Sequence, residues 1–329
     1  MSELAVRLPP GRIAHLRRSA TIVVTTHGVV RVEGGGALQC LQGLLTNDVD
    51  KPGDGTLVYG AFLTPKGMIV TDAWSMRRGE RFTLVVPACG RNALLDIFRR
   101  TLPPRLAKPA DVTGDSAVAW LIGRAGAELP AAAQLAPLPD GPSRVVEIDT
   151  PAGPVLLASG AETSFFSAMI VGAGAAVESV VARLQAAGAR LGDPSDLEAA
   201  RVLAGWPALG LEIDDRTLPQ EVRYDELGGV SYTKGCYTGQ ETVARLHFRG
   251  HTNRDLRGLV WHDAAPVTDP AVIKDGKPVG SVRSILASGD RTVALALLRR
   301  EVGVGDVVTA AGRAATVVPL PFAETLIAG

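Results

Sequence analysis

Cys236 lies in a short stretch whose residue types could do chemistry. Residues 234–245 read KGCYTGQETVAR, with Gly235 directly before the cysteine and Gly239 three residues after it. Glycines allow an exposed tight turn. A thiol near the free amide groups at the start of a helix, with Lys234 close in sequence, has its thiolate form favoured. The stretch therefore predicts a reactive thiol at Cys236.

A helix is expected to follow this cysteine directly. Thr238 and Glu241 have the three-residue spacing of a capping box, for a helix that begins at Gly239. The same stretch also has a purely structural interpretation, because a free cysteine is often a small buried hydrophobe and glycines often only satisfy turn dihedrals. Local chemistry alone leaves both interpretations open. His247 and His251 form no catalytic motif, and we expect structural roles for both.

Metal binding is a second chemistry that a thiolate offers. The three cysteines, Cys40, Cys89 and Cys236, lie far apart and form no C-x-x-C pair. The pattern therefore supports neither a disulfide framework nor a structural zinc site. No metal site is predicted, and a lone cysteine holds an iron–sulfur cluster only if the cluster is transient or shared with a partner.

The composition indicates a globular chain without a specialised charged surface. The 329 residues are 46% hydrophobic and 21% charged, which is enough for two or three compact units. Lysine and arginine number 34 and aspartate and glutamate 34, so we expect neither direct nucleic-acid contact nor a membrane surface. The most apolar run, residues 165–177, is too short to cross a bilayer and is expected to be buried. No signal core follows the N-terminus, so we expect a cytoplasmic protein.

Several elements must position the residues named above. The β-branched runs on either side of residues 26–28 predict a β-hairpin. Residues 38–45 place leucines on one helical face before a polar turn, which predicts a short helix. Residues 56–87 contain three β-rich runs with turns at TPKG and RRGE. These runs predict an antiparallel meander of three strands.

The rest of the chain divides into a mixed part and an all-β part. Residues 177–187 predict a helix, and Ser195 with Glu198 has capping-box spacing for another. The Pro/Ala-rich residues 128–142 predict a loop. Strands and helices alternate without the regular repeat of a parallel sheet, so the predicted fold class is α+β. After about residue 255, short strands with glycine or proline turns predict a small β-barrel or sandwich.

The cysteine stretch resembles the signature of the YgfZ-type folate-binding proteins. These are relatives of the glycine-cleavage T-protein (aminomethyltransferase), and the branch includes iron–sulfur assembly factors. The signature positions in this chain are Lys234, Gly235, Cys236, Tyr237, Gly239, Gln240, Glu241 and Arg245. Further segments similar to the family are LQGLLTNDV, GAFLTPKGMIVTD, ARVLAGWPALGLEI, LPQE, VALALLRREVGVGDVV and VVPLPF. The resemblance covers essentially the whole chain.

The resemblance implies an architecture and a ligand. It implies two interwoven α+β subdomains over residues 1–250, a C-terminal β-barrel over residues 251–329, and a central cavity for tetrahydrofolate. Asp72 aligns with the acidic residue that faces the reactive folate nitrogen in the T-protein, so Asp72 and Cys236 are the candidate catalytic residues. The other candidates for the folate cavity are Asn47, Asp48, Lys66 and Arg223.

One position departs from the family pattern. Leu203 aligns with an acidic residue that the T-protein branch uses to bind the pterin, and leucine cannot form that pair. Three alternatives follow: the pterin is held differently, folate affinity is weak, or the cavity serves another ligand. The T-protein also lacks the cysteine signature. Both differences favour a function other than glycine-cleavage aminomethyl transfer.

Three functions are therefore expected, in descending order. The first is a tetrahydrofolate-binding accessory protein for assembly or repair of iron–sulfur enzymes, with Cys236 as its functional thiol and iron–sulfur assembly or client proteins as partners. The second is a folate-dependent one-carbon transferase in which Asp72 steers attack on a folate-bound carbon. The third is a folate-sensing interaction module without catalysis.

Overall fold

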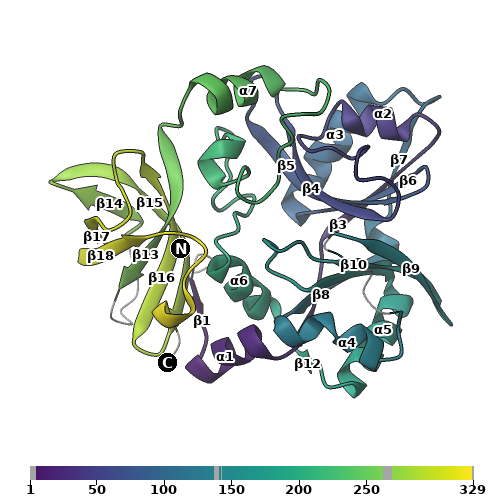
Figure 1. Ribbon diagram of the computed structural model, residues 1–329, viewed down its shortest axis with the longest axis horizontal. Coiled ribbons are helices and arrows are strands. Elements are labelled where there is room, and N and C mark those ends of the chain that lie inside the picture. The colour runs from purple at the N-terminus through teal and green to yellow at the C-terminus, as the bar shows by residue number, and fades with distance from the viewer. Residues whose placement is uncertain (1–4, 137–140, 142, 262–268, 328–329) are drawn as a thin grey trace.

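The computed structural model describes residues 5–136, 141, 143–261 and 269–327 (Figure 1). It is an α+β protein built on three sheets, which confirms the predicted fold class. The two mixed α+β parts lie side by side, and the all-β part stands beside them (Figure 1). No helix in these residues is both long and apolar enough to span a membrane.

The five-stranded sheet contains the predicted meander. Its order is β4-β5-β6-β3-β7, and its first three strands are consecutive and antiparallel, as the sequence predicts. Every residue of β4 is buried because one face of the sheet packs on helices and the other faces the centre of the molecule. The strands are β3 (Gly28–Glu33), β4 (Thr56–Leu63), β5 (Ile69–Arg78), β6 (Arg81–Val86) and β7 (Lys108–Asp111).

The six-stranded sheet forms the second α+β part. Its order is β12-β2-β8-β11-β10-β9, and α5 (Gly174–Ala186) packs on it through five buried residues. The apolar run predicted to be buried supplies β11 at its centre. The strands are β2 (Thr21–Thr25), β8 (Ser116–Ile122), β9 (Val145–Thr150), β10 (Gly153–Ser159), β11 (Ala168–Ala173) and β12 (Arg190–Leu191).

The predicted hairpin around residues 26–28 is wrong. β2 pairs with β8 and β12, whereas β3 pairs with β6 and β7, so the two strands belong to different sheets. β2 pairs with β8 along all five of its residues and β3 with β6 along all six of its residues, and the turn between them carries the chain from one sheet to the other. The two α+β parts are therefore interwoven.

The third sheet closes into a six-stranded antiparallel barrel. The ring runs β15-β14-β17-β18-β13-β16 and returns to β15, which confirms the predicted all-β part. β1 (Ala5–Arg7), from the other end of the chain, adds to β15 in parallel. The barrel strands are β13 (Arg254–Trp261), β14 (Ala271–Lys274), β15 (Lys277–Ser288), β16 (Arg291–Arg299), β17 (Val307–Ala310) and β18 (Arg313–Val318).

The helices depart from the sequence predictions at two points. α6 begins after Asp193, whose side chain accepts from the Ser195 amide while Asp196 bonds back, so the capping box lies two residues before the predicted one. Pro194 at the first helical position favours this start. The predicted loop 128–142 contains a short helix, and its residues 137–140 and 142 lie outside the described residues. The remaining helices are α1 (Pro10–Arg18), α2 (Ala37–Gln42), α3 (Arg91–Thr101), α4 (Leu129–Ala132), α6 (Pro194–Leu203) and α7 (Gln240–Arg249).

Candidate functional site

An aromatic cavity of about 200 Å³ lies between the two α+β parts and α6. Trp74 and Trp206 form one wall, with stacked indoles 5.3 Å apart at 21°. Trp120 and Phe165 form a second stacked pair, with ring centroids 5.6 Å apart. Flat apolar walls with a few convergent polar groups are typical of sites for planar heterocycles.

Asp72 supplies this cavity with a buried carboxyl group. It lies on β5 and is 7% exposed. The Tyr59 hydroxyl donates to Oδ2 at 3.0 Å and contacts the Tyr224 hydroxyl at 2.9 Å, while Oδ1 is buried without a partner. Burial raises the pKa of Asp72 to about 6, against the opposing effect of the Tyr59 hydrogen bond. This carboxyl group can therefore hold or release a proton near neutral pH.

His27 lies on the same cavity, at the crossing between β2 and β3. Its Nδ1 is 2.6 Å from Thr25 Oγ1, which also accepts from Trp120 Nε1 at 2.9 Å. Burial lowers the pKa of His27 to about 4, so the imidazole is neutral at physiological pH. The misassigned hairpin thus places a neutral, hydrogen-bonded histidine in the cavity wall.

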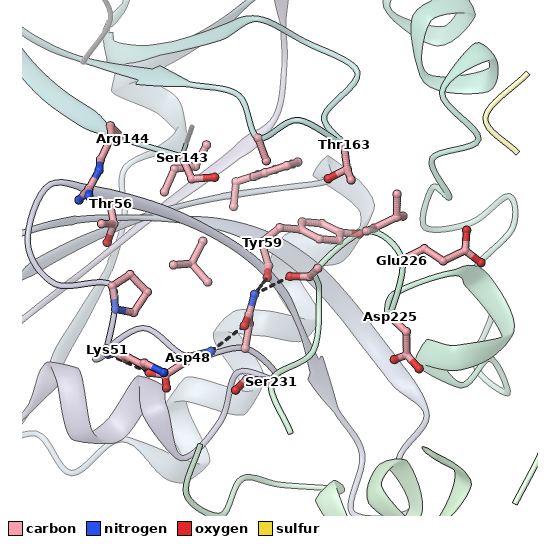
Figure 2. A pocket seen from close by; sticks show the side chains of 18 of the residues that line it. Asp48, Lys51, Thr56, Tyr59, Ser143, Arg144, Thr163, Asp225, Glu226 and Ser231 are labelled. Atoms are coloured by element: carbon pink, nitrogen blue, oxygen red, sulfur yellow. Dashed lines mark hydrogen bonds between the residues drawn. The ribbon is translucent and has the colours of Figure 1, made fainter. Parts of the chain in front are cut away.

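A larger cleft of about 640 Å³ lies beside the aromatic cavity, and Trp74 lines both. β4 forms its floor and the segment before the cysteine turn forms one side. Figure 2 shows Lys51 and Arg144 toward one end of the cleft, and Asp225 and Glu226 toward the other. The cleft therefore has two cations, together with the Asp48 carboxylate, toward one end and only carboxylates among the labelled charged side chains toward the other.

Asn47 and Asp48, both predicted for the folate cavity, line the larger cleft instead of the aromatic cavity. The Asn47 amide donates to the carbonyls of Tyr59 and Gly228, at 2.8 and 2.7 Å. Burial alone would raise the pKa of Asp48, but hydrogen bonds from the Lys51 backbone and other donors hold it below its usual value. Both side chains also shape the loop between α2 and β4.

Lys66 and Arg223 line neither of these two cavities. Lys66 is exposed in the turn between β4 and β5. The Arg223 guanidinium is buried, donates to the carbonyls of Gly205 and Leu320 at 2.7 and 3.2 Å, and pairs with Glu226 at 2.8 Å. Arg223 thus ties the end of α6 to the segment after the barrel. The cations that the structure brings to the cleft are Lys51 and Arg144, which the sequence did not indicate.

The cysteine turn differs from the prediction in how its helix begins. α7 starts at Gln240, and its N-cap is Gly239 with φ +81° and no side-chain cap, so the predicted Thr238 capping box is wrong. A Cβ on Gly239 would meet the Thr64 carbonyl oxygen at 2.6 Å. The close approach of the β4–β5 turn therefore requires glycine here, and the left-handed conformation displaces the cap.

Cys236 is exposed at the tip of this turn and lines neither the aromatic cavity nor the cleft. The Thr238 amide donates to the Gly43 carbonyl at 3.1 Å, which fixes the turn against the end of α2. Within the described part of the chain, the thiol makes no hydrogen bond. Its exposure makes it accessible to another protein.

Lys234 anchors the turn instead of contacting the thiol. It is 8% exposed, and its Nζ donates to the carbonyls of Leu45 and Asn47, each at 2.7 Å. Burial lowers its pKa to about 8, against the opposing charge of Asp48. Its ammonium also lies 5.2 Å from the Tyr237 ring centroid. The signature lysine thus links the cysteine turn to the α2–β4 loop through hydrogen bonds.

The remaining signature residues lie on the surface at the start of α7. Gln240 is half-buried, and Glu241 and Arg245 are exposed. His247, one turn further, stacks on Tyr232 with ring centroids 3.6 Å apart, and its Nδ1 is 3.4 Å from Asp225 Oδ2.

A charged cluster around α6 is a further part of the site that the sequence prediction missed. Arg201, 6% exposed, donates from Nε to Glu198 Oε2 at 2.8 Å, from Nη1 to Glu212 Oε2 at 2.9 Å and from Nη2 to barrel residue Ser284 at 2.6 Å. Glu198 and Arg201 both line the aromatic cavity. Their three-residue spacing on a predicted helix was the available signal.

The described residues do not fit a metal or cluster site on this chain alone. They contain no group of three or more His, Cys, Asp or Glu side chains arranged to hold a metal ion. Cys40, Cys89 and Cys236 are separate free thiols.

Comparison with known proteins gives a consistent family. A family model described as the GCVT N-terminal domain matches residues 12–135. The tRNA-modifying protein YgfZ of Yersinia enterocolitica is 27% identical over 319 residues, covering 90% of each chain. An aminomethyltransferase of Rubrobacter xylanophilus is 29% identical over 320 residues, covering 93% of this chain and 83% of the relative. The fold matches the glycine cleavage system aminomethyltransferase T from Bartonella henselae with a TM-score of 0.78, at 20% identity, over 95% of this chain and 89% of that one.

Proposed function

This chain is a YgfZ-type relative of the glycine-cleavage T-protein family, and from that premise we propose that it binds a reduced folate and serves iron–sulfur enzymes as an accessory protein. In this proposal the folate ring occupies the aromatic cavity, and Cys236 acts on a partner protein at the surface. The two tasks are assigned to separate places because Cys236 lines neither the aromatic cavity nor the cleft.

The observation that carries the folate proposal is the free oxygen of Asp72. Oδ1 is buried without a partner in a cavity walled by indole rings. A buried polar atom without a hydrogen bond is costly, and an N–H of a pterin ring would supply the missing donor. A bound reduced folate would supply a ring nitrogen that can carry a one-carbon unit. Asp72 would orient that ring, and its raised pKa allows it to hold a proton there.

The cleft beside the cavity suits the anionic part of the same ligand. Folate ends in glutamate carboxylates, and Lys51 with Arg144 provides cations at one end of the cleft. Trp74 lines both spaces, so they are neighbours, and this proposal has one ligand extending past the indole from the cavity into the cleft. We assign the tail to Lys51 and Arg144 in place of Lys66 and Arg223.

The thiol proposal rests on exposure and on anchoring. Cys236 is exposed, and Lys234 and Thr238 hold its turn on either side. On an iron–sulfur client or assembly protein, a fixed, accessible thiol suits attack on a disulfide, which releases one of its sulfurs as a thiolate, or replacement of a thiolate ligand of a cluster. Such a cluster is cargo in transit, because the described residues offer no ligand set to keep it.

Calorimetry under reducing, anaerobic conditions tests both parts. Tetrahydrofolate is titrated into wild-type, Asp72→Ala and Cys236→Ala proteins. We expect binding to wild-type and Cys236→Ala proteins, and a loss of at least about tenfold in affinity for Asp72→Ala because its buried hydrogen bond is removed. Absence of binding to the wild-type protein contradicts the folate proposal. Full restoration of cluster-enzyme activity in a deletion strain by Cys236→Ala contradicts the thiol proposal.

A second function, one-carbon transfer, is favoured by the raised pKa and the free oxygen of Asp72. A carboxyl group that titrates near neutral pH can take or give the proton of a reacting amine. The test is folate-dependent turnover with an aminomethyl donor. Turnover that disappears in Asp72→Asn supports this function, and its absence in the wild-type protein excludes it for that donor.

A further inference from the structure

Leu203 does not contribute to the aromatic cavity. Its side chain is buried in the main hydrophobic core, and its carbonyl accepts from the Phe322 amide at 3.0 Å, beyond the barrel strands. It is absent from the residues that line the cavity. The position at which relatives are expected to carry a pterin-gripping acid is therefore a packing position here.

One turn and a half earlier on α6, Glu198 presents a carboxylate to the same cavity. Arg201 holds it side-on, with Nε donating to Oε2 at 2.8 Å and Nη2 donating to Oε1. A carboxylate has about four acceptor positions, and Arg201 fills two of them. The Glu198 side chain is 28% exposed, so the others are open to a ligand.

Arg201 pairs with Glu198, which lines the cavity, and with Glu212, which does not, so these three groups together carry one excess negative charge. A single guanidinium pairs with both Glu198 and Glu212, at 2.8 and 2.9 Å, so one cation faces two carboxylates. Glu212 is fully buried, and its Oε1 has no partner. Arg201 also donates hydrogen bonds from Nη2 to the Ser284 hydroxyl and from Nη1 to the Trp206 carbonyl. An excess negative charge in a half-buried wall favours a ligand that brings N–H donors.

A second acceptor that lines the cavity is Asp72, whose Oδ1 is also without a partner. The stacked indoles of Trp74 and Trp206 add a flat face. The volume of about 200 Å³ is suited to a bicyclic ring without its tail. Flat shape, small volume and acceptor-rich walls together select a planar heterocycle with N–H donors on its edges.

We propose that Glu198 is the specificity-determining acid of this cavity and accepts from the 2-amino group and ring N–H of a pterin, in the role that Leu203 cannot perform. The proposal rests on the proposed folate function. Arg201 acts as a positioning residue, which fixes the Glu198 carboxylate in the cavity wall through two hydrogen bonds. The cavity thereby rejects flat rings that lack the amino group.

The test pairs a change in the protein with a change in the ligand. Wild-type and Glu198→Gln proteins are titrated by calorimetry with tetrahydrofolate and with an analogue whose 2-amino group is replaced by methyl. For the wild-type protein we expect the analogue to bind about 10- to 100-fold more weakly, as for loss of a hydrogen bond to a charged group. For Glu198→Gln we expect weaker tetrahydrofolate binding and a much smaller difference between the two ligands.

Controls separate the possible failures. Glu178→Gln makes the same chemical change on an exposed part of α5, and should bind both ligands like the wild type. Glu198→Asp keeps the charge and should retain discrimination between the ligands even if its affinity falls. Equal discrimination in wild-type and Glu198→Gln proteins, with tetrahydrofolate still bound, overturns the assignment of Glu198 and leaves the folate function standing. No tetrahydrofolate binding by the wild-type protein overturns both.

Discussion

The aromatic cavity and the cysteine turn are built in opposite ways. The cavity consists of aromatic and charged groups from the five-stranded sheet, the six-stranded sheet and α6. Its polar atoms form hydrogen bonds with residues distant in sequence. The turn exposes its cysteine and depends on backbone contacts, with Lys234 buried and Gly239 packed closely against the β4–β5 turn. Changes in the cavity should therefore alter stability as well as binding, whereas changes at the thiol should alter function alone.

The largest expected effect comes from the charged cluster of the cavity wall. Arg201→Ala leaves the Glu212 carboxylate buried without its cation and removes the contact to Ser284. Breaking a buried ion pair in this way costs about 3–5 kcal/mol in the free energy of unfolding. Urea unfolding of the wild-type and Arg201→Ala proteins measures this loss of stability. Arg249→Ala, an exposed arginine on α7, is the matched control and should stay within about 0.5 kcal/mol of wild type.

Asp72 should make stability fall as pH rises. Its pKa of about 6 in the folded protein lies above the ordinary aspartate pKa of 3.8, so between these pH values the folded protein binds more protons than the unfolded chain, and the free energy of unfolding falls as pH rises. Asp72→Asn should remove this dependence, and be more stable than wild type by about 1–3 kcal/mol at pH 7. Urea unfolding at pH 4 and pH 7 checks it. An equal difference between the two proteins at both pH values would show that Asp72 does not titrate as stated.

Lys234 should show that the turn depends on its anchor more than on its thiol. Lys234→Ala leaves the carbonyls of Leu45 and Asn47 without this donor and should cost about 1–3 kcal/mol. The Thr238 amide donates to the Gly43 carbonyl, and in Lys234→Ala its hydrogen exchange should be faster than in wild type. The increase should exceed what the loss of global stability explains, because the turn opens locally. Unchanged protection of that amide would mean that the turn is held by other contacts.

The smallest effect on stability is expected at the cysteine itself. Cys236→Ser changes an exposed side chain without a hydrogen bond to the described residues, so the free energy of unfolding should shift by at most about 0.5 kcal/mol. Thermal or urea unfolding measures this shift, and tetrahydrofolate affinity should be unchanged. A decrease of more than about 1 kcal/mol in the free energy of unfolding would show that the thiol contributes to packing. The cysteine turn would then not differ from the cavity in this respect.

Much of the fold could be predicted from local pattern. The β4–β5–β6 meander, the buried run of β11 and the all-β C-terminal part follow from alternation, turn residues and apolar runs, which are local properties. The cap positions of α6 and α7 could not be predicted, because several polar residues at each start have suitable spacing. Asp193 is the N-cap of α6 because Pro194 favours the first helical position. Gly239 is the N-cap of α7 because the β4–β5 turn approaches it too closely for a side chain.

The sequence by itself determined the chemistry available and the family pattern: one cysteine in a glycine-flanked turn, Asp72 in a strand, and Leu203 in place of an acid. Tertiary structure alone decided which groups meet. It placed β2 and β3 in different sheets, placed Lys66 and Arg223 outside the aromatic cavity and the cleft, and placed Glu198 in the wall of the aromatic cavity. The physical reason is that burial and long-range pairing set both the pKa of a carboxyl group and the partner of a lysine, and neither is encoded in local periodicity.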